Sequence, residues 1–411
     1  MPEQPQRRRS VVMLTADREI DRRILFEADS LQAAGWTVTI VAMPLDSGQS
    51  DGDPRIVRLS ASGTPAAREN LMLQTYRWVR RSVPMNGVAM RALKRWAWRY
   101  LLDQEVFFVR LFTDTASRFS PDVFVAHDLP MLAVARQQAE RCSAKLVYDS
   151  HELYSEQEFS EREKLRWAQI ESRHIGMCDA VITVNESIAA ELEKRYGVRD
   201  VAVIYNADRA SASLERSKLF HELFSLPPST RVLLLQGGLS AGRNLESLIE
   251  AMAHVRDESI ALVILGDGTL AKKLAASAQR LGLGSRIYFH PAVPQKELPR
   301  YAMAADAGVI PYQAICLNNY FCTPNKLFEF IAAGLPILAS DLPELRKMVK
   351  GRDIGLVGDM SRPEGMARLI EELFRDEGRL AAWTRHACAA RKEVCWEVEG
   401  RKLVAIYDGL Q

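Results

Sequence analysis

The sequence has no long apolar stretch. No run in its 411 residues approaches the roughly 18–20 apolar residues that a helix needs to cross a bilayer. The first ten residues are polar and basic, and the apolar run that follows, Val11–Leu14, is too short for the core of a secretory signal peptide. We therefore expect a cytoplasmic protein, and peripheral contact at the inner face of the cytoplasmic membrane stays open.

Signatures of metal and nucleotide binding are also scarce. The six cysteines are scattered, and no pair has the spacing of a zinc knuckle. The chain has no GK[ST] phosphate loop and no GxGxxG fingerprint after its first apolar run, and we identify no DxD carboxylate pair that would hold a divalent cation. Its net charge of +2 gives no sign of nucleic-acid binding. We expect no metal and no bound cofactor, and a dinucleotide-dependent oxidoreductase is disfavoured.

Short apolar runs alternate with longer helical patterns along the whole chain. Such runs, separated by helices, are typical of parallel strands that are covered on both faces. This alternation predicts an α/β fold with two doubly wound parallel sheets, the first domain over residues 1–207 and the second over 208–394. The runs are Val11–Leu14, Val38–Ala42, Val123–Ala126, Leu146–Tyr148, Ala180–Val184 and Val201–Ile204, then Val232–Gln236, Ile260–Leu265, Ile287–Phe289, Ala307–Ile310, Ile337–Ala339 and Ile354–Val357.

One basic, aromatic segment interrupts this alternation. Residues 68–110 hold nine Lys/Arg and three Asp/Glu, together with three of the seven tryptophans. Basic helices rich in Trp can lie among the headgroups of an anionic membrane, whereas the simpler interpretation is a solvated helical insertion. The candidate contact residues are Arg91, Lys94, Arg95, Trp96, Trp98 and Arg99.

A glycine-containing turn follows the first strand of the second domain. Gly237 and Gly238 allow the backbone to approach a ligand closely, and the helix that starts near Leu245 offers N–H groups to a phosphate. Arg243 adds a cation at the same place. The alternative is a tight strand–helix turn with a surface arginine.

A second phosphate or sugar contact is predicted where a helix begins after Thr323 and Pro324. Lys326 and Glu329 share one face of this helix, and the rest of it is almost entirely apolar. A charge on a buried helix needs a partner, for which a ligand phosphate or hydroxyl is a candidate. A surface salt bridge is the alternative.

Two strands of the first domain end in a histidine beside an acid. His127 and Asp128 follow one strand, and His151 and Glu152 follow the next. Open α/β sheets bind ligands at the carboxyl ends of their strands, so we expect these residues to lie at a ligand site. Structural histidines are the alternative. We identify no third ligand at helix or strand spacing that would make this a metal site.

With these motifs the chain resembles glycosyltransferase family 4, the group 1 glycosyltransferases with the GT-B fold. The resemblance spans nearly the whole chain and is carried by the turn that ends at Arg243-Asn244-Leu245, the strand end VILGDG over 263–268, the helix KLFEFIAAGLP over 326–336, and the HDLP and DSHE strand ends. It implies two Rossmann-like domains that face each other across a cleft. It also implies that the last helix, residues 395–411, returns to the first domain.

The resemblance assigns roles to single residues. His127 stands beside the transferred sugar, Arg243 neutralises the donor diphosphate, and Glu329 holds the ribose hydroxyls. The acceptor-side candidates are Asp128, His151 and Glu152. The chain departs from the family at Phe321, where the first glutamate of a paired motif is usual, and at Gly238, where an arginine is common. We expect Lys326 to replace that lost cation. The implied donor-binding set is Gly237, Gly238, Arg243, Gly266, Pro291, Val293, Thr323, Asn325, Lys326 and Glu329, with His127, Arg243 and Lys326 as the catalytic group.

The implied activity is a retaining, metal-independent transfer of a hexosyl group from a nucleoside-diphosphate sugar. The acceptor would be a glycan or a lipid-linked molecule in bacterial surface polysaccharide synthesis, and the leaving phosphate would help to deprotonate it. Two alternatives stay open. One is a non-catalytic scaffold subunit with the same fold, and the other is a nucleotide-sugar epimerase, which needs no acceptor.

Overall fold

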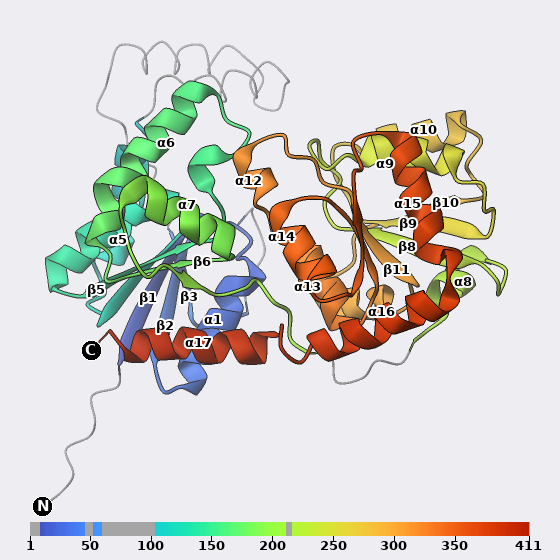
Figure 1. Cartoon of the computed structure of the whole chain (residues 1–411). Coiled ribbons are helices and arrows are strands. Elements are labelled where there is room, and N and C mark those ends of the chain that lie inside the picture. Colours follow the sequence, from blue (N-terminus) through green and yellow to red (C-terminus); the bar gives the residue numbers. More distant parts are fainter. Residues whose placement is uncertain (1–8, 46–51, 60–102, 211–215, 411) are drawn as a thin grey trace, which may run out of the picture. The chain divides into compact units, whose positions relative to one another are not determined.

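The computed structural model describes residues 9–45, 52–59, 103–210 and 216–410, and the chain forms two compact units (Figure 1). The first unit comprises Met1–Thr183, Ala189–Val203 and Leu403–Gln411. The second comprises Val184–Ile188 and Ile204–Lys402. Residues 68–102 of the basic aromatic segment, which include Arg91, Lys94, Arg95, Trp96, Trp98 and Arg99, lie outside the described residues.

The first unit is built on a seven-stranded sheet in the order β3-β2-β1-β4-β5-β6-β7, in which every neighbouring pair is parallel. Its described elements are β1 Ser10–Thr15, α1 Arg22–Ala33, β2 Thr37–Ala42, β3 Ile56–Arg58, α4 Gln104–Ala116, β4 Val123–His127, α5 Leu129–Cys142, β5 Lys145–Ser150, α6 Glu161–His174, β6 Ala180–Thr183, α7 Glu186–Tyr196 and β7 Ala202–Val203.

The second unit has a six-stranded parallel sheet in the order β10-β9-β8-β11-β12-β13. Its described helices and strands are α8 Leu219–Phe224, β8 Arg231–Gln236, α9 Leu245–His254, β9 Ile260–Leu265, α10 Ala271–Arg280, β10 Ile287–His290, α11 Leu298–Ala302, β11 Ala307–Ile310, α12 Leu317–Tyr320, α13 Asn325–Ala332, β12 Ile337–Ser340, α14 Pro343–Leu345, β13 Gly355–Gly358, α15 Pro363–Arg375, α16 Glu377–Ala390 and the first part of α17 Trp396–Asp408, whose last residues belong to the first unit.

The predicted fold class, two parallel-sheet α/β domains, is confirmed. Each of the twelve apolar runs coincides with a strand, and all six residues of β9 are buried, as expected for a strand covered on both faces. The edge strand β3 was not predicted, because it is only three residues long and half-buried. Among the described residues, no helix is both long and apolar enough to cross a membrane.

Local interactions place the strand ends that carry the polar residues. Asp21 caps α1 by accepting a hydrogen bond from the Arg23 backbone N–H at 2.7 Å. Asp128 precedes α5 with a positive φ of 63°, and its side chain does not cap that helix. That carboxylate instead accepts a hydrogen bond from the His151 backbone N–H at 3.0 Å, which ties the end of β4 to the end of β5.

The end of the chain packs within the first unit. Tyr407 of α17 is fully buried and meets the Trp36 ring edge-to-face, with centroids 5.7 Å apart. Asp408 forms an ion pair with Arg9 at 2.6 Å. The residues of α17 before Leu403 belong to the second unit.

Candidate functional site

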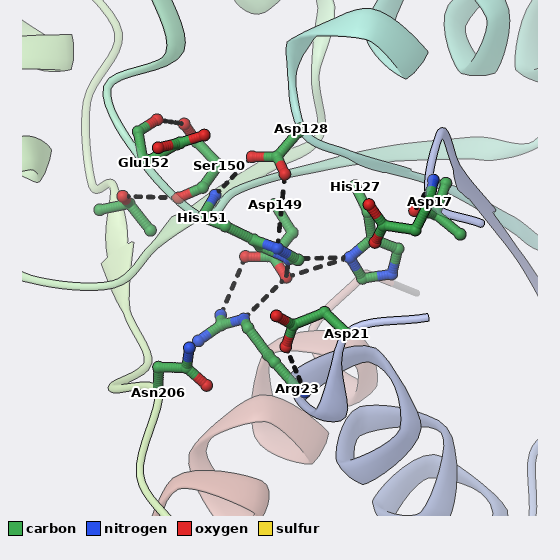
Figure 2. Close-up of polar contacts among 12 residues, drawn as sticks. Asp17, Asp21, Arg23, His127, Asp128, Asp149, Ser150, His151, Glu152 and Asn206 are labelled. Carbon is green, nitrogen blue, oxygen red and sulfur yellow. Dashed lines mark hydrogen bonds and ion pairs between the residues drawn. The ribbon is translucent and has the colours of Figure 1, made fainter. Parts of the chain in front are cut away.

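Two histidines and one carboxylate meet at the carboxyl ends of β4 and β5. His127 and Asp149 are register partners in the sheet, so their side chains lie side by side. His127 Nδ1 is 3.3 Å and His151 Nε2 is 3.0 Å from the same Asp149 oxygen, and these two nitrogens are 3.1 Å apart. Figure 2 shows both rings turned toward this carboxylate.

Arg23 of α1 approaches the same carboxylate from another side (Figure 2). Its Nε and Nη2 donate to the two oxygens of Asp149 at 3.1 and 2.9 Å, which is the bidentate geometry of a strong ion pair. Its Nε also lies 2.8 Å from Glu27, one helical turn further along α1. The side chains of Arg23, Glu27 and Asp149 are completely buried.

The charges of this cluster follow from burial and from these contacts. Burial opposes ionisation of Asp149, but Arg23 and His151 outweigh it and hold the pKa of this carboxyl well below its usual range. For His151, burial is outweighed by Asp128 and Asp149, which raise its pKa to about 10. Burial lowers the pKa of His127, and burial beside Asp149 raises the pKa of Glu27 well above its usual value. At neutral pH the cluster therefore holds ionised Asp149, charged His151 and neutral His127.

The acceptor-side candidates lie around this cluster. Asp128 is 3.5 Å from His151 Nδ1 and is partly exposed. Glu152 accepts a hydrogen bond from the Gln157 amide, and its backbone carbonyl accepts one from Ser150 at 2.8 Å. The buried Nε2 atom of His127 has no hydrogen-bond partner among the described residues. Such an atom normally has a partner, so it marks the point where a ligand would bind.

The same cluster contains the groups that could hold a metal ion. One ligand atom each from Glu27, His127, Asp149 and His151 can be found within 4.8 Å of one another. Arg23, however, already neutralises the Asp149 carboxylate, and its Nε lies 2.8 Å from the carboxyl group of Glu27. A divalent cation would have to displace or approach a buried guanidinium, which is electrostatically unfavourable. The residues therefore fit an internal ion pair better than a metal site.

In the second unit, two cations converge on the glycine turn after β8. Arg243 Nη1 donates to the Gly238 carbonyl at 2.8 Å, and its guanidinium lies 5.7 Å from the centroid of the Tyr312 ring. Lys326 Nζ is 5.1 Å from the same ring and 3.8 Å from the place that a Cβ on Gly237 would occupy. Two like charges gathered beside exposed backbone form a cradle for an anion.

Lys326 carries an electrostatic cost in this position. The residue is 5% exposed, and burial, followed by repulsion from Arg243, lowers its pKa to about 7 despite the nearby Glu329. A bound phosphate would restore the charge of the lysine. Arg243 occupies the space that a side chain at Gly238 would need, because a Cβ there would lie 3.2 Å from Arg243 Nη1. Lys326 lies in the same way beside Gly237.

Backbone packing fixes the shape of this turn. A Cβ on Gly266 would lie 2.0 Å from the Gly237 carbonyl oxygen, so the two loops touch through main chain alone. Asp267 then accepts a hydrogen bond from the Ala292 N–H at 3.0 Å, which draws in the loop that contains Pro291 and Val293. The turn leads into α9 through Asn244, which has a positive φ of 56° and makes no side-chain cap to that helix.

The other predicted donor residues are less tightly gathered. Glu329 accepts a hydrogen bond from the Gln236 amide at the end of β8. Thr323 is buried before α13, whereas Asn325 is exposed and accepts a hydrogen bond from Asn206 at 2.6 Å. A surface pocket of about 540 Å³ lies beside Tyr312, and its lining residues include Gln313, Ser340 and Met360.

Sequence reasoning did not single out Arg23, Glu27, Gln236 or Tyr312. Arg23 is one of many arginines, and only its contact with Asp149, 126 residues away, shows its importance. Gln236 is buried, and its amide oxygen has no hydrogen-bond partner among the described residues, at a strand end that the sequence does identify. A polar residue at the end of an apolar run is the signal that would have found it, the same signal that marks His127 and His151.

Both halves of the chain match known protein families. Residues 20–207 match the family described as glycosyl transferase 4-like domain, and residues 220–390 match the glycosyl transferases group 1. A curated relative is a D-inositol 3-phosphate glycosyltransferase of Xylanimonas cellulosilytica, 26% identical over 195 residues. That alignment covers 45% of this chain and 44% of the relative, so it spans less than half of the relative's length.

Solved structures share the fold over almost the entire chain. Sucrose-phosphate synthase from Thermosynechococcus elongatus superimposes with a TM-score of 0.74 at 16% identity, covering 98% of this chain and 99% of that one. Anabaena HepE in complex with UDP-glucose gives a TM-score of 0.66 at 15% identity, covering 97% and 99%. The chain therefore has the GT-B fold, with a match to the glycosyl transferase 4-like domain in its first part and to the glycosyl transferases group 1 in its second.

Proposed function

We propose that the chain is a retaining, metal-independent hexosyltransferase that uses a nucleoside-diphosphate sugar as donor. The observation that carries this proposal is the pair of cations, Arg243 and Lys326, beside the Gly237–Gly238 turn and the Tyr312 ring. The likeness to Anabaena HepE, whose structure was solved in complex with UDP-glucose, supports a nucleotide-sugar donor. The scaffold and epimerase alternatives are outcomes of the tests below.

The chemistry requires charge stabilisation at the leaving group. The bond between the anomeric carbon and the diphosphate oxygen breaks, and the diphosphate leaves with the electron pair, while the acceptor oxygen forms the new bond to that carbon. The acceptor proton passes to the leaving phosphate oxygen. The transition state has oxocarbenium character, and negative charge grows on the diphosphate. Arg243 and Lys326 supply fixed positive charge for it, which is the role that a metal ion has in other transferases.

The acceptor is proposed from composition alone. The segment over residues 68–110, basic and rich in tryptophan, suits an anionic or lipid-linked glycan, as in surface polysaccharide synthesis. In an assay of vesicle binding and sugar transfer, the double variant Arg95→Glu/Arg99→Glu should weaken both. Unchanged binding and unchanged transfer would remove the membrane part of the proposal and leave the donor part intact.

The decisive experiment is donor binding without metal. UDP, GDP, ADP and CMP are tested by thermal shift in EDTA, and the same screen is repeated with magnesium. A nucleotide at 100 times its dissociation constant stabilises the folded state by about 2.7 kcal/mol, a clear shift. We expect one nucleoside diphosphate to stabilise the wild type in EDTA and to lose its effect in Arg243→Ala. An effect that needs magnesium would overturn metal independence.

Turnover then separates the enzyme from its alternatives. The corresponding nucleotide sugar is incubated with candidate acceptors, and the anomeric configuration of the product is read by NMR. A product with the donor's configuration supports retention, and an inverted product contradicts it. Binding without turnover would support the scaffold interpretation, and a changed sugar without any acceptor would support the epimerase.

A further inference from the structure

Arg23 and Asp149 form a completely buried ion pair at the end of β5. Two oppositely charged groups lose their hydration when they are buried together, so such a pair is weak evidence of a stabilising role. Here the pair also engages both histidines of the strand ends, through the Asp149 oxygen that lies 3.0 Å from His151 Nε2 and 3.3 Å from His127 Nδ1. The one imidazole nitrogen of His127 outside this network, Nε2, is buried and unpartnered among the described residues.

The geometry determines which nitrogen of His127 carries the proton. Asp149 is ionised and accepts only, so each imidazole nitrogen that faces it is best satisfied as a donor. His151 is charged, and its Nε2–H lies 3.0 Å from Asp149 Oδ2 and 3.1 Å from His127 Nδ1. It donates to Asp149, since a carboxylate is a stronger acceptor than a neutral imidazole. His127 is neutral and has one proton, which goes to Nδ1. Its Nε2 atom then has a free lone pair.

Arg23 keeps this arrangement in place. Its two hydrogen bonds, 3.1 Å from Nε to Oδ2 and 2.9 Å from Nη2 to Oδ1, fix the plane of the Asp149 carboxylate. Because α1 is itself anchored by the Asp21 cap, Arg23 holds the carboxylate from a rigid element. Without Arg23 the carboxylate could rotate or take up a proton, and a protonated Asp149 would donate to His127 Nδ1 and reverse the tautomer.

We propose that Arg23 and Asp149 are positioning residues that hold His127 as the Nδ1–H tautomer, so that its Nε2 accepts a hydrogen bond from a sugar hydroxyl. The identity of the hydroxyl as a substrate group rests on the proposed function. The Nδ1–H tautomer of His127 does not depend on the proposed function, because it is inferred from contacts within the first unit alone. The hydroxyl can belong to the donor sugar or to the acceptor, and these two sources give different results below.

The tautomer is measured by nitrogen NMR of the full chain labelled with ¹⁵N-histidine. Signals of His127 and His151 are assigned with the variants His127→Gln and His151→Gln. We expect His127 to show a protonated Nδ1 and a bare Nε2 at neutral pH, and His151 to show two protonated nitrogens. A protonated Nε2 on wild-type His127 would overturn the proposal without any variant.

Variants test whether the ion pair imposes the tautomer. Asp149→Asn offers an amide that can donate to Nδ1, so the Nε2–H form should become the major one. Glu27→Gln is the matched control, since Glu27 also contacts Arg23 but is already neutral by its raised pKa, and it should leave the spectrum of His127 unchanged. If Asp149→Asn does not fold, the double variant Arg23→Met/Asp149→Asn removes both buried charges and should show the same redistribution. A folded variant with an unchanged tautomer ratio would contradict the proposal.

Ligand addition identifies the source of the hydroxyl. UDP-glucose should shift the Nε2 signal of His127 if the donor sugar supplies the hydroxyl, and UDP, which lacks the sugar, should not. A shift that appears only with acceptor assigns it to the acceptor. In a transfer assay, Asp149→Asn should lower kcat about tenfold, the value of one hydrogen bond, with KM for the donor little changed. If the wild type transfers no sugar, the proposed function is refuted. The NMR spectrum of His127 tests the tautomer independently of that result.

Discussion

Arg23 in the first unit and Lys326 in the second are both buried cations at a strand-end cluster, yet their surroundings are opposite. Arg23 meets two carboxylates, Glu27 and Asp149. Lys326 meets an aromatic ring and lies near a second cation, and its pKa falls to about 7. Removing a neutralised cation leaves its buried partner with less compensation, whereas a cation that lies near another cation costs stability until an anion binds. The difference separates a positioning network from a binding site.

The same substitution at Arg23 and at Lys326 tests whether the two cations differ in their contribution to stability. Arg23→Met should reduce the free energy of unfolding by about 3–5 kcal/mol, because it removes the buried cation that binds both oxygens of Asp149 and leaves His151 as the charged partner of this carboxylate. Lys326→Met should leave stability unchanged or raise it. Urea denaturation of both variants at pH 7 measures the two effects side by side. Equal losses would mean that Lys326 has a structural role after all.

The glycine turn should be nearly as sensitive. Gly266→Ala places a Cβ 2.0 Å from the Gly237 carbonyl, in a backbone conformation with φ of +150° that side chains rarely adopt. We expect a loss of about 1–3 kcal/mol in stability and the loss of nucleotide binding. Gly284→Ala is the control, since nothing lies within 4 Å of its Cβ position and its φ is not positive. Intact nucleotide binding by Gly266→Ala would exclude this turn from the donor site.

Donor affinity should depend on both cations of the second unit. Arg243→Ala and Lys326→Met should each weaken binding of the nucleotide sugar by about 1.5–3 kcal/mol, the usual value of a hydrogen bond to a charged group. Isothermal titration calorimetry in EDTA measures the dissociation constants. Arg136→Ala, at an exposed ion pair of the first unit, should leave them unchanged. Wild-type affinity in Lys326→Met would show that Arg243 alone holds the diphosphate.

The affinity for the nucleotide sugar should depend on pH because of the protonation of Lys326. Its pKa of about 7 in the free protein, lowered by burial and Arg243 and opposed by Glu329, means that it must take up a proton above pH 7 to face an anion. The dissociation constant of a nucleotide sugar, whose diphosphate does not titrate near neutrality, should rise by up to about tenfold per pH unit above pH 7. Lys326→Met should abolish this slope, and a slope that persists would point to another group.

The smallest effect is expected at Glu27. Its raised pKa means that the folded state binds more protons than the unfolded state above the usual glutamate pKa, so the contribution of Glu27 to stability declines as pH rises from there. Glu27→Gln mimics the protonated form, and it should change stability at pH 4 by no more than about 0.5 kcal/mol. Denaturation midpoints from pH 4 to 8 should therefore fall more steeply for the wild type than for the variant. Parallel curves would mean that Glu27 is ionised beside Arg23.

The strands and the location of the two clusters could be predicted from the sequence, and the partners within each cluster could not. Apolar runs such as Ile260–Leu265 are visible because burial on both faces leaves no polar position. Polar residues at strand ends, such as His127 and His151, were visible for the same reason. The short edge strand β3 left no such signal, because its residues are only half-buried.

Two α/β domains, the strand ends that carry polar side chains and the glycine turn that precedes Arg243 all follow from the linear sequence. Those features depend on residues that are neighbours in the chain, where periodicity and turn chemistry act. In contrast, Arg23 neutralises Asp149 across 126 positions, and Lys326 joins Arg243 beside the Tyr312 ring, only because the chain folds. Such contacts form when separate elements pack together, so the charge of each group, and with it the chemistry it can perform, is set by neighbours that the linear sequence does not reveal.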